Sequence, residues 1–191
     1  WFSEFIYPHQ RHVFATEHVR ARRGDRILDI GCGPADLLSH LPAGVEYVGF
    51  DPSPAYIRHA TRRFGARGRF HCGYVDRAAI DALGAASFDL VVAHGVLHHL
   101  DDAQVRQFFV LAHAALRPGG RLITSDGCYT PSQSRLARLV LSLDRGLHVR
   151  TREAYTDLAR HVFGEVAAFV RDDTFRIPYT MVFLECVRAR G

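Results

Sequence analysis

Three observations predict an α/β fold built on a mostly parallel sheet of seven strands with helices on both faces. Short apolar runs rich in branched side chains alternate with segments that have the 3.6-residue period of a helix. The 191 residues are 48% hydrophobic and 23% charged, which is typical of a globular domain. Only residues 171–178 join the last two apolar runs, too few for a helical crossover, so we expect these last strands to be antiparallel.

The expected strands are separated by recognisable helix boundaries. The helix after the second strand should begin at Ser53, a capping residue followed by Pro54, and end at Gly65. The helix after the fourth strand should begin near Asp102 and stop at the Arg117-Pro118-Gly119-Gly120 run. The seven strands are expected at Arg26–Ile30, Glu46–Phe50, Arg69–Val75, Phe88–Ala93, Gly120–Ser125, Glu165–Val170 and Tyr179–Val187.

Charge and cysteine usage exclude several classes of function. All 24 basic residues are Arg, so neither a Lys Schiff base nor a phosphate-loop Lys is possible. The Arg residues are spread along the chain, which argues against nucleic-acid binding. Four Cys without metal-finger spacing indicate reduced thiols in a cytoplasmic protein, and no apolar run approaches the roughly 18 residues of a membrane span.

A glycine turn follows the first strand and indicates where a ligand binds. Gly31 and Gly33 leave backbone that a ligand can approach closely, and a helix starting near Pro34 would offer unpaired N–H groups. Asp51 ends the second strand, where a carboxylate can accept hydrogen bonds from both ribose hydroxyls. Together these features predict a ligand that contains a nucleoside.

The residues around the turn favour a cationic methyl donor over a dinucleotide. A dinucleotide turn needs a glycine at position 36 and must accept two phosphate charges, but position 36 is Asp. Asp29 adds a second carboxylate, and no Lys or Arg lies between Asp29 and His40. Such a field suits an ammonium and a sulfonium better than a pyrophosphate.

Four linked motifs over residues 24–126 resemble the class I S-adenosylmethionine-dependent methyltransferases of small molecules: LDIGCGP, GFDPSP, FDLVVAHGVLHHLDD and LRPGGRLITSD. The resemblance implies a Rossmann-like fold with S-adenosylmethionine as cofactor. It also implies that Asp29 and the turn Gly31, Cys32 and Gly33 hold the methionine part and that Asp51 holds the ribose. The family's acidic residue for adenine would follow Gly73, but here Tyr74 and Val75 come first and Asp76 two places late, so the adenine contact falls among these three residues.

His94 ends the fourth strand, where the methyl group would be presented, and is the first candidate for a general base that also touches the cofactor. Asp126, after the fifth strand, is the second candidate. The alternative is that His94 only packs against the cofactor and that alignment carries the reaction. A cluster formed by His94, His98, His99, Asp101 and Asp102 could be read as a metal site. In the family that the chain resembles, the HHL run and the acids after it open a helix, so we expect no metal.

The predicted function is methyl transfer to an oxygen, in preference to nitrogen or carbon, of a small-molecule acceptor. The alternatives are a catalytically inactive cofactor-binding or partner-activating module and an NAD(P)-dependent oxidoreductase. We expect one domain (1–191) divided into an N-terminal helical segment (1–24), a cofactor-binding core (25–126), inserted helices over the acceptor site (127–163) and C-terminal strands (164–191). Residues expected at the acceptor are Tyr129, Arg145, Arg150 and Tyr179.

Overall fold

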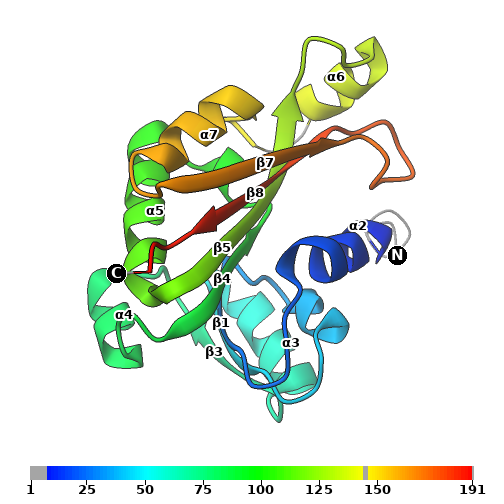
Figure 1. Ribbon diagram of the computed structural model, residues 1–191. Coiled ribbons are helices and arrows are strands. Elements are labelled where there is room, and N and C mark those ends of the chain that lie inside the picture. Colours follow the sequence, from blue (N-terminus) through cyan, green and yellow to red (C-terminus); the bar gives the residue numbers. More distant parts are fainter. Residues whose placement is uncertain (1–7, 144–145, 191) are drawn as a thin grey trace.

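The computed structural model describes residues 8–143 and 146–190, which fold around one mixed sheet (Figure 1). The strand order is β3-β2-β1-β4-β5-β8-β7, and a short β6 pairs with β5 off this path. All pairs in the main path are parallel except β5 with β8 and β8 with β7. The predicted Rossmann-like sheet with antiparallel last strands is therefore confirmed. The strands are β1 (Arg26–Ile30), β2 (Glu46–Asp51), β3 (Gly68–Cys72), β4 (Phe88–His94), β5 (Leu116–Tyr129), β6 (Arg150–Thr151), β7 (Glu165–Arg171) and β8 (Met181–Val187).

Helices cover both faces of the sheet, as Figure 1 shows. One face packs against α4 (Arg77–Leu83), α5 (Asp102–Ala115) and α7 (Arg152–Arg160). The other face packs against the N-terminal π-helix η1 (Phe14–Val19), the 3₁₀-helix η2 (Asp36–His40), α3 (Pro54–Phe64) and part of α6 (Arg135–Ser142). The remaining helical pieces are α2 (Pro8–Val13) and η3 (Leu97–His99). Within the described ranges, no helix has the length and apolar character needed to cross a bilayer.

The predicted helix boundaries agree with the observed caps. The Ser53 side chain caps α3, and Asp101 forms a capping box with Gln104 at the start of α5. The strand after α5 differs from the prediction because β5 begins at Leu116, immediately after the helix, and not at Gly120. Between the pairs Phe88–Leu116 and Leu90–Arg121, β4 advances by two residues and β5 by five, so the Pro-Gly-Gly run bulges out of a continuous strand.

Candidate functional site

The functional residues that the sequence predicts in the core collect at the carboxyl edge of the parallel strands. β1, β2 and β4 end at Ile30, Asp51 and His94, and parallel strands present these ends on one side of the sheet. Along β1 and β4, Asp29 and His94 share a face with the core residues Ile27 and Val92, which pack beneath the N-terminal helices. The carboxylate and the imidazole therefore face the same layer.

The glycine turn after β1 is held tightly and leaves open space at Gly33. The N–H groups of Gly31 and Cys32 both donate to the carbonyl of Phe50, at 2.8 and 2.9 Å. Gly31 has φ +78°, and an added Cβ would lie 2.6 Å from Val96 Cγ2, so the approach of the loop after β4 requires glycine there. Gly33 also has positive φ, but nothing lies within 4 Å of its Cβ position, which leaves room for a ligand.

The helix expected from Pro34 is absent, and the short η2 replaces it. Ala35 has φ +60° in the left-handed region, so α-helical backbone cannot run through it. Its N–H donates to the Cys32 carbonyl, and the Leu38 N–H donates to the Ala35 carbonyl. The N–H groups at Ala35 and Leu38 are thus used inside the chain and are not offered to a ligand, which corrects the expectation of a free helix start.

Asp51 organises the turn from the end of β2. Its Oδ2 accepts a hydrogen bond from the Gly33 N–H at 3.0 Å, and its Oδ1 accepts one from the Ser53 N–H at 2.8 Å. A carboxylate offers about four lone-pair sites, so two remain for other donors. Asp51 can therefore shape the turn and still accept hydroxyl groups of a bound nucleoside.

Asp29 is a buried acid with one unused oxygen. Its Oδ2 accepts a hydrogen bond from the Tyr47 hydroxyl, whereas its Oδ1 has no partner among the described residues. Burial raises the pKa of this carboxyl from 3.8 to about 7; the Tyr47 hydrogen bond opposes the shift, and the nearby Asp51 charge adds to it. An orphaned, buried carboxylate oxygen is costly unless a cation or donor reaches it, so Asp29 fits the ammonium of a ligand.

Asp36 contributes less to the field at the turn than its place in the sequence suggests. Its carboxylate pairs with Arg63 at 2.8 Å and with Arg11 at 3.3 Å. Both arginines are far from Asp36 in the sequence. The acidic field beside the turn therefore comes from Asp29 and Asp51. Burial raises the pKa of the neighbouring Cys32 thiol far above its usual range, so this cysteine is a packed, uncharged side chain.

His94 is surrounded by residues that the sequence analysis did not single out. Its Nδ1 lies 2.6 Å from Ser125 Oγ and 3.3 Å from the amide nitrogen of Gln10, and its ring stacks on Phe14 at 5.3 Å between centroids. The Gln10 amide nitrogen is a donor and the Ser125 hydroxyl can act as one, so in this arrangement Nδ1 is the acceptor and Nε2 carries the proton. Burial lowers the pKa of His94 to about 3, with Arg11 and His98 adding to the effect, so the imidazole is neutral and a poor proton acceptor.

Asp126 lies on the opposite face from His94, because side chains alternate along β5 and Ser125 is the residue aligned with His94. The carboxylate is 1% exposed; its Oδ1 accepts the His98 N–H at 3.2 Å and lies 2.9 Å from His98 Nδ1. This placement corrects the prediction that Asp126 stands beside the methyl group as a second base. The buried Asp126–His98 pair instead ties η3 to β5.

The three residues predicted for the adenine contact have different environments after the end of β3. Asp76 is exposed and caps α4, where one oxygen of its carboxylate accepts the Ala79 N–H at 2.7 Å, so its assignment as a cofactor ligand stays a prediction. Tyr74 is 81% exposed, and the Cβ position of the preceding Gly73 has nothing within 4 Å. Val75 is half-buried against the core. Tyr74 and Asp76 are thus both exposed, whereas Val75 is half-buried.

The described residues predicted for the acceptor lie near one another at the end of β5, because Arg150 pairs with Cys128 next to Tyr129 and Tyr179 packs against Gly127, but their side chains have different roles. The Arg150 guanidinium donates to the carbonyls of Leu97, Leu100 and His148 and to the Asp102 carboxylate, so it clamps the loop before α5 and is not available to a substrate. Tyr129 lies beneath the Arg138 guanidinium at 5.2 Å.

Tyr179 is buried against Phe175 and fills the space where Gly127 lacks a side chain. Both tyrosines, Tyr129 and Tyr179, lie at or beside the carboxyl end of β5, beyond which Figure 1 shows α6. Arg145 lies outside the described residues. Among those described, no three His, Cys, Asp or Glu side chains are grouped to hold a metal ion.

Together, the fold and the turn define an α/β domain that binds a nucleoside-containing cofactor, and comparison with known proteins gives its family. Residues 28–122 match a family model described as a methyltransferase domain. The 27-O-demethylrifamycin SV methyltransferase of Amycolatopsis mediterranei is 33% identical over 126 residues, which are 60% of this chain and 43% of that protein. Phosphoethanolamine N-methyltransferase 1 of Zea mays is 26% identical over 166 residues, which are 84% of this chain and 32% of that protein.

A solved structure of Haemonchus contortus phosphoethanolamine N-methyltransferase 2, with phosphomonomethylethanolamine and S-adenosylhomocysteine, has the same fold. The TM-score is 0.72 at 17% identity, covering 95% of this chain and 53% of that chain. This chain therefore belongs to the class I S-adenosylmethionine-dependent methyltransferases. The chain spans less than half the length of the two curated relatives described above.

Proposed function

We propose that this chain transfers the methyl group of S-adenosylmethionine to an oxygen atom of a small-molecule acceptor. The observation that carries the proposal is one layer at the carboxyl edge of the sheet that holds an unpaired carboxylate oxygen of Asp29, the open turn at Gly33 and the His94 ring. The first two would hold the cofactor, and the third would face the acceptor.

The residues at the turn fit the donor. Asp29 would pair with the ammonium of the methionine part, because its orphaned Oδ1 needs a cation or a donor. Asp51 would accept the ribose hydroxyls with the lone pairs that Gly33 and Ser53 leave free. Tyr74 and Val75 would border the adenine. A dinucleotide, as in the oxidoreductase alternative, would place its phosphate charges beside Asp29 and Asp51, which repel them.

His94 would hold the acceptor oxygen in line with the methyl group. When bound, S-adenosylmethionine supplies a methyl carbon on a cationic sulfur; the new C–O bond forms as the C–S bond breaks, and its electron pair stays on sulfur. The neutral imidazole would donate its Nε2–H to a lone pair of the acceptor oxygen, because Ser125 and Gln10 occupy Nδ1. Its depressed pKa makes it a poor proton acceptor, so the acceptor should bring an oxygen that loses its proton to water, such as a phenol.

The choice of oxygen over nitrogen or carbon also rests on His94. The relatives include an enzyme named as an O-methyltransferase and one named as an N-methyltransferase, so their names do not decide between oxygen and nitrogen. An N–H donor at Nε2 complements the lone pairs of an oxygen, whereas the N–H groups of an amine would meet another donor. The alternative of an inactive cofactor-binding module makes a different prediction, namely cofactor binding without product.

The test incubates the purified chain with methyl-labelled S-adenosylmethionine and matched phenol, aniline and thiol acceptors while S-adenosylhomocysteine is measured. We expect product with phenols, increasing with the fraction of phenolate. A preference for the aniline at equal concentration would contradict the oxygen assignment. Saturating S-adenosylhomocysteine, at about 100 times its dissociation constant, should stabilise the fold by about 2.7 kcal/mol, and NAD should not. Stabilisation without turnover of any acceptor would favour the inactive module.

A further inference from the structure

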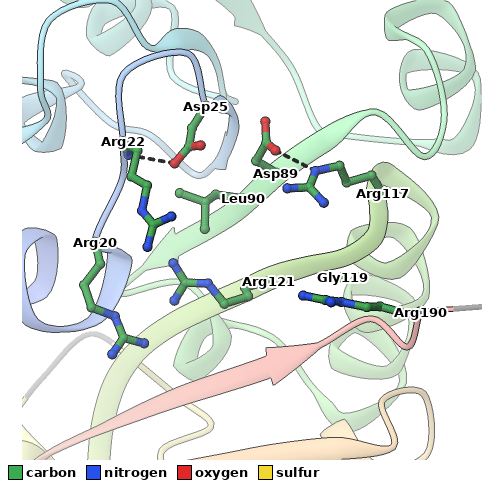
Figure 2. Close-up of a pocket in the computed structure, with 9 residues that line it drawn as sticks. All are labelled: Arg20, Arg22, Asp25, Asp89, Leu90, Arg117, Gly119, Arg121 and Arg190. Atoms are coloured by element: carbon green, nitrogen blue, oxygen red, sulfur yellow. Dashed lines mark hydrogen bonds and ion pairs between the residues drawn. The ribbon is translucent and has the colours of Figure 1, made fainter.

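A second candidate site lies at the opposite edge of the sheet from the glycine turn. It is a pocket of about 440 Å³ where β4 and β5 begin, with η1, β1 and the chain after β8 around it (Figure 2). Asp89 and His94 are five residues apart on β4, which places the pocket about 17 Å from the methyl-transfer site at roughly 3.3 Å per residue. The pocket is therefore separate from the site proposed for the cofactor and acceptor.

The lining of this pocket is strongly cationic. Five of its residues are Arg and two are Asp, so the lining carries a net charge of +3. The bulge in β5 builds one wall, because the three additional residues of β5 project Arg117 and Gly119 at the pocket. The chain has no Lys, so every one of these charges is a planar guanidinium that stays protonated at physiological pH.

Three of the five arginines have partners in the protein. Arg117 pairs with Asp89 at 2.6 Å. Arg20 pairs with Glu185, which is not part of the lining. Arg121 donates to the carbonyls of His18 and Val19, and its nearest carboxylate, Glu185, is 3.9 Å away. The positive charge at Arg121 is thus only weakly compensated.

The other two, Arg22 and Arg190, have no ion pair or side-chain hydrogen bond with the described residues. The Asp25 carboxylate, which could neutralise Arg22, accepts the Arg22 backbone N–H instead, at 2.7 Å. Figure 2 shows the guanidinium group of Arg121 directed toward that of Arg22, and the guanidinium group of Arg190 beside Gly119 at the other end of the pocket. Burial lowers the pKa of Arg121, and the charges of Arg20 and Arg22 add to this effect.

We propose that this pocket binds a phosphate-bearing small molecule, through Arg22, Arg121 and Arg190. Guanidinium groups bind phosphate oxygens through paired N–H donors, and a multivalent anion relieves the repulsion among the cations that line the pocket. A volume of about 440 Å³ exceeds that of a single phosphate and suits the lower range of small-ligand pockets, so a phosphate ester or diphosphate is the class that fits.

The test is calorimetry with sodium pyrophosphate as the probe, at constant ionic strength, on the wild-type chain and two double variants. Arg22→Gln with Arg190→Gln removes the two unpaired guanidinium groups. Arg58→Gln with Arg106→Gln removes the same charge from exposed positions on α3 and α5. We expect saturable binding to the wild-type chain, at least about tenfold weaker binding to the first variant and unchanged binding to the second.

Three results would overturn the proposal: no binding above the effect of ionic strength, equal binding to both double variants, or a glutamate-rich peptide of matched charge that binds as tightly as pyrophosphate. The last result would mean that the pocket attracts acidic peptides in general and does not recognise phosphate. S-Adenosylhomocysteine affinity should be the same with and without pyrophosphate, because the two sites lie at opposite edges. The outcome is independent of whether the chain transfers methyl groups.

Discussion

Replacing Asp29 by Asn should remove a pH dependence that this buried carboxyl imposes on both stability and cofactor affinity. The folded protein raises the pKa of Asp29 from 3.8 to about 7 because the group is buried. A carboxyl whose pKa is raised on folding favours the folded state only while protonated, so wild-type stability should fall as the pH rises from about 4 to 7. Three pKa units correspond to about 4 kcal/mol.

The asparagine variant keeps the shape of the protonated acid and cannot ionise. In urea unfolding without ligand, Asp29→Asn should therefore be more stable than wild type by up to about 4 kcal/mol at pH 8 and by about 2 kcal/mol at pH 5.5. The matched control is Asp81→Asn, which removes the same charge from an exposed carboxylate paired with Arg77 on α4. This control should show no comparable gain.

Cofactor affinity should change with pH in the opposite direction from stability. The ionised carboxylate pairs with an ammonium, so binding lowers the pKa of Asp29 and affinity rises with pH. With a pKa of about 7, the ionised fraction of the free protein changes from about one tenth at pH 6 to about nine tenths at pH 8, so S-adenosylhomocysteine should bind about tenfold more tightly at pH 8. In calorimetry, the Asp29→Asn variant should bind S-adenosylhomocysteine more weakly than wild type at pH 8, and its affinity should not change between pH 6 and pH 8. Equal wild-type affinities at pH 6 and pH 8, or an unaltered pH dependence in the variant, would refute the assignment.

Substitutions at three other residues test the site. Asp51→Ala should weaken S-adenosylhomocysteine binding at least about tenfold in calorimetry, because the carboxylate also holds the Gly33 turn; unchanged affinity would leave Asp51 no role at the ribose. His94→Ala should lower kcat about tenfold, and His94→Gln should restore most of it, because an amide can donate as Nε2–H does; a loss of about 10²–10⁴-fold in both variants would make His94 a base. Arg150→Ala should reduce the free energy of unfolding by about 2–4 kcal/mol without changing acceptor KM, and a rise in KM at unchanged stability would return Arg150 to the acceptor site.

Local sequence determined the positions of most elements and of the glycine turn that we propose holds the cofactor. The apolar periodicity of helices and strands depends on residues that are close in the sequence, and so do helix caps such as Ser53 and Asp101. Gly31, Gly33 and Asp51 could be recognised because a turn between a strand and its helix needs glycine, and the carboxylate follows the next strand. The exception at Ala35 shows the limit of this local reading: its left-handed backbone replaced the expected helix with η2.

Only the tertiary structure decided which side chains meet at the site. His94 and Ser125 come together because β4 and β5 pair in that register, and the same alternation sends Asp126 to the other face. Gln10 reaches His94 across 84 residues of sequence, and the raised pKa of Asp29 comes from burial, a property of the packed sheet. The arginine pocket likewise joins residues from four separate segments. Such contacts are set by register and packing between distant segments, which no local pattern of residues encodes.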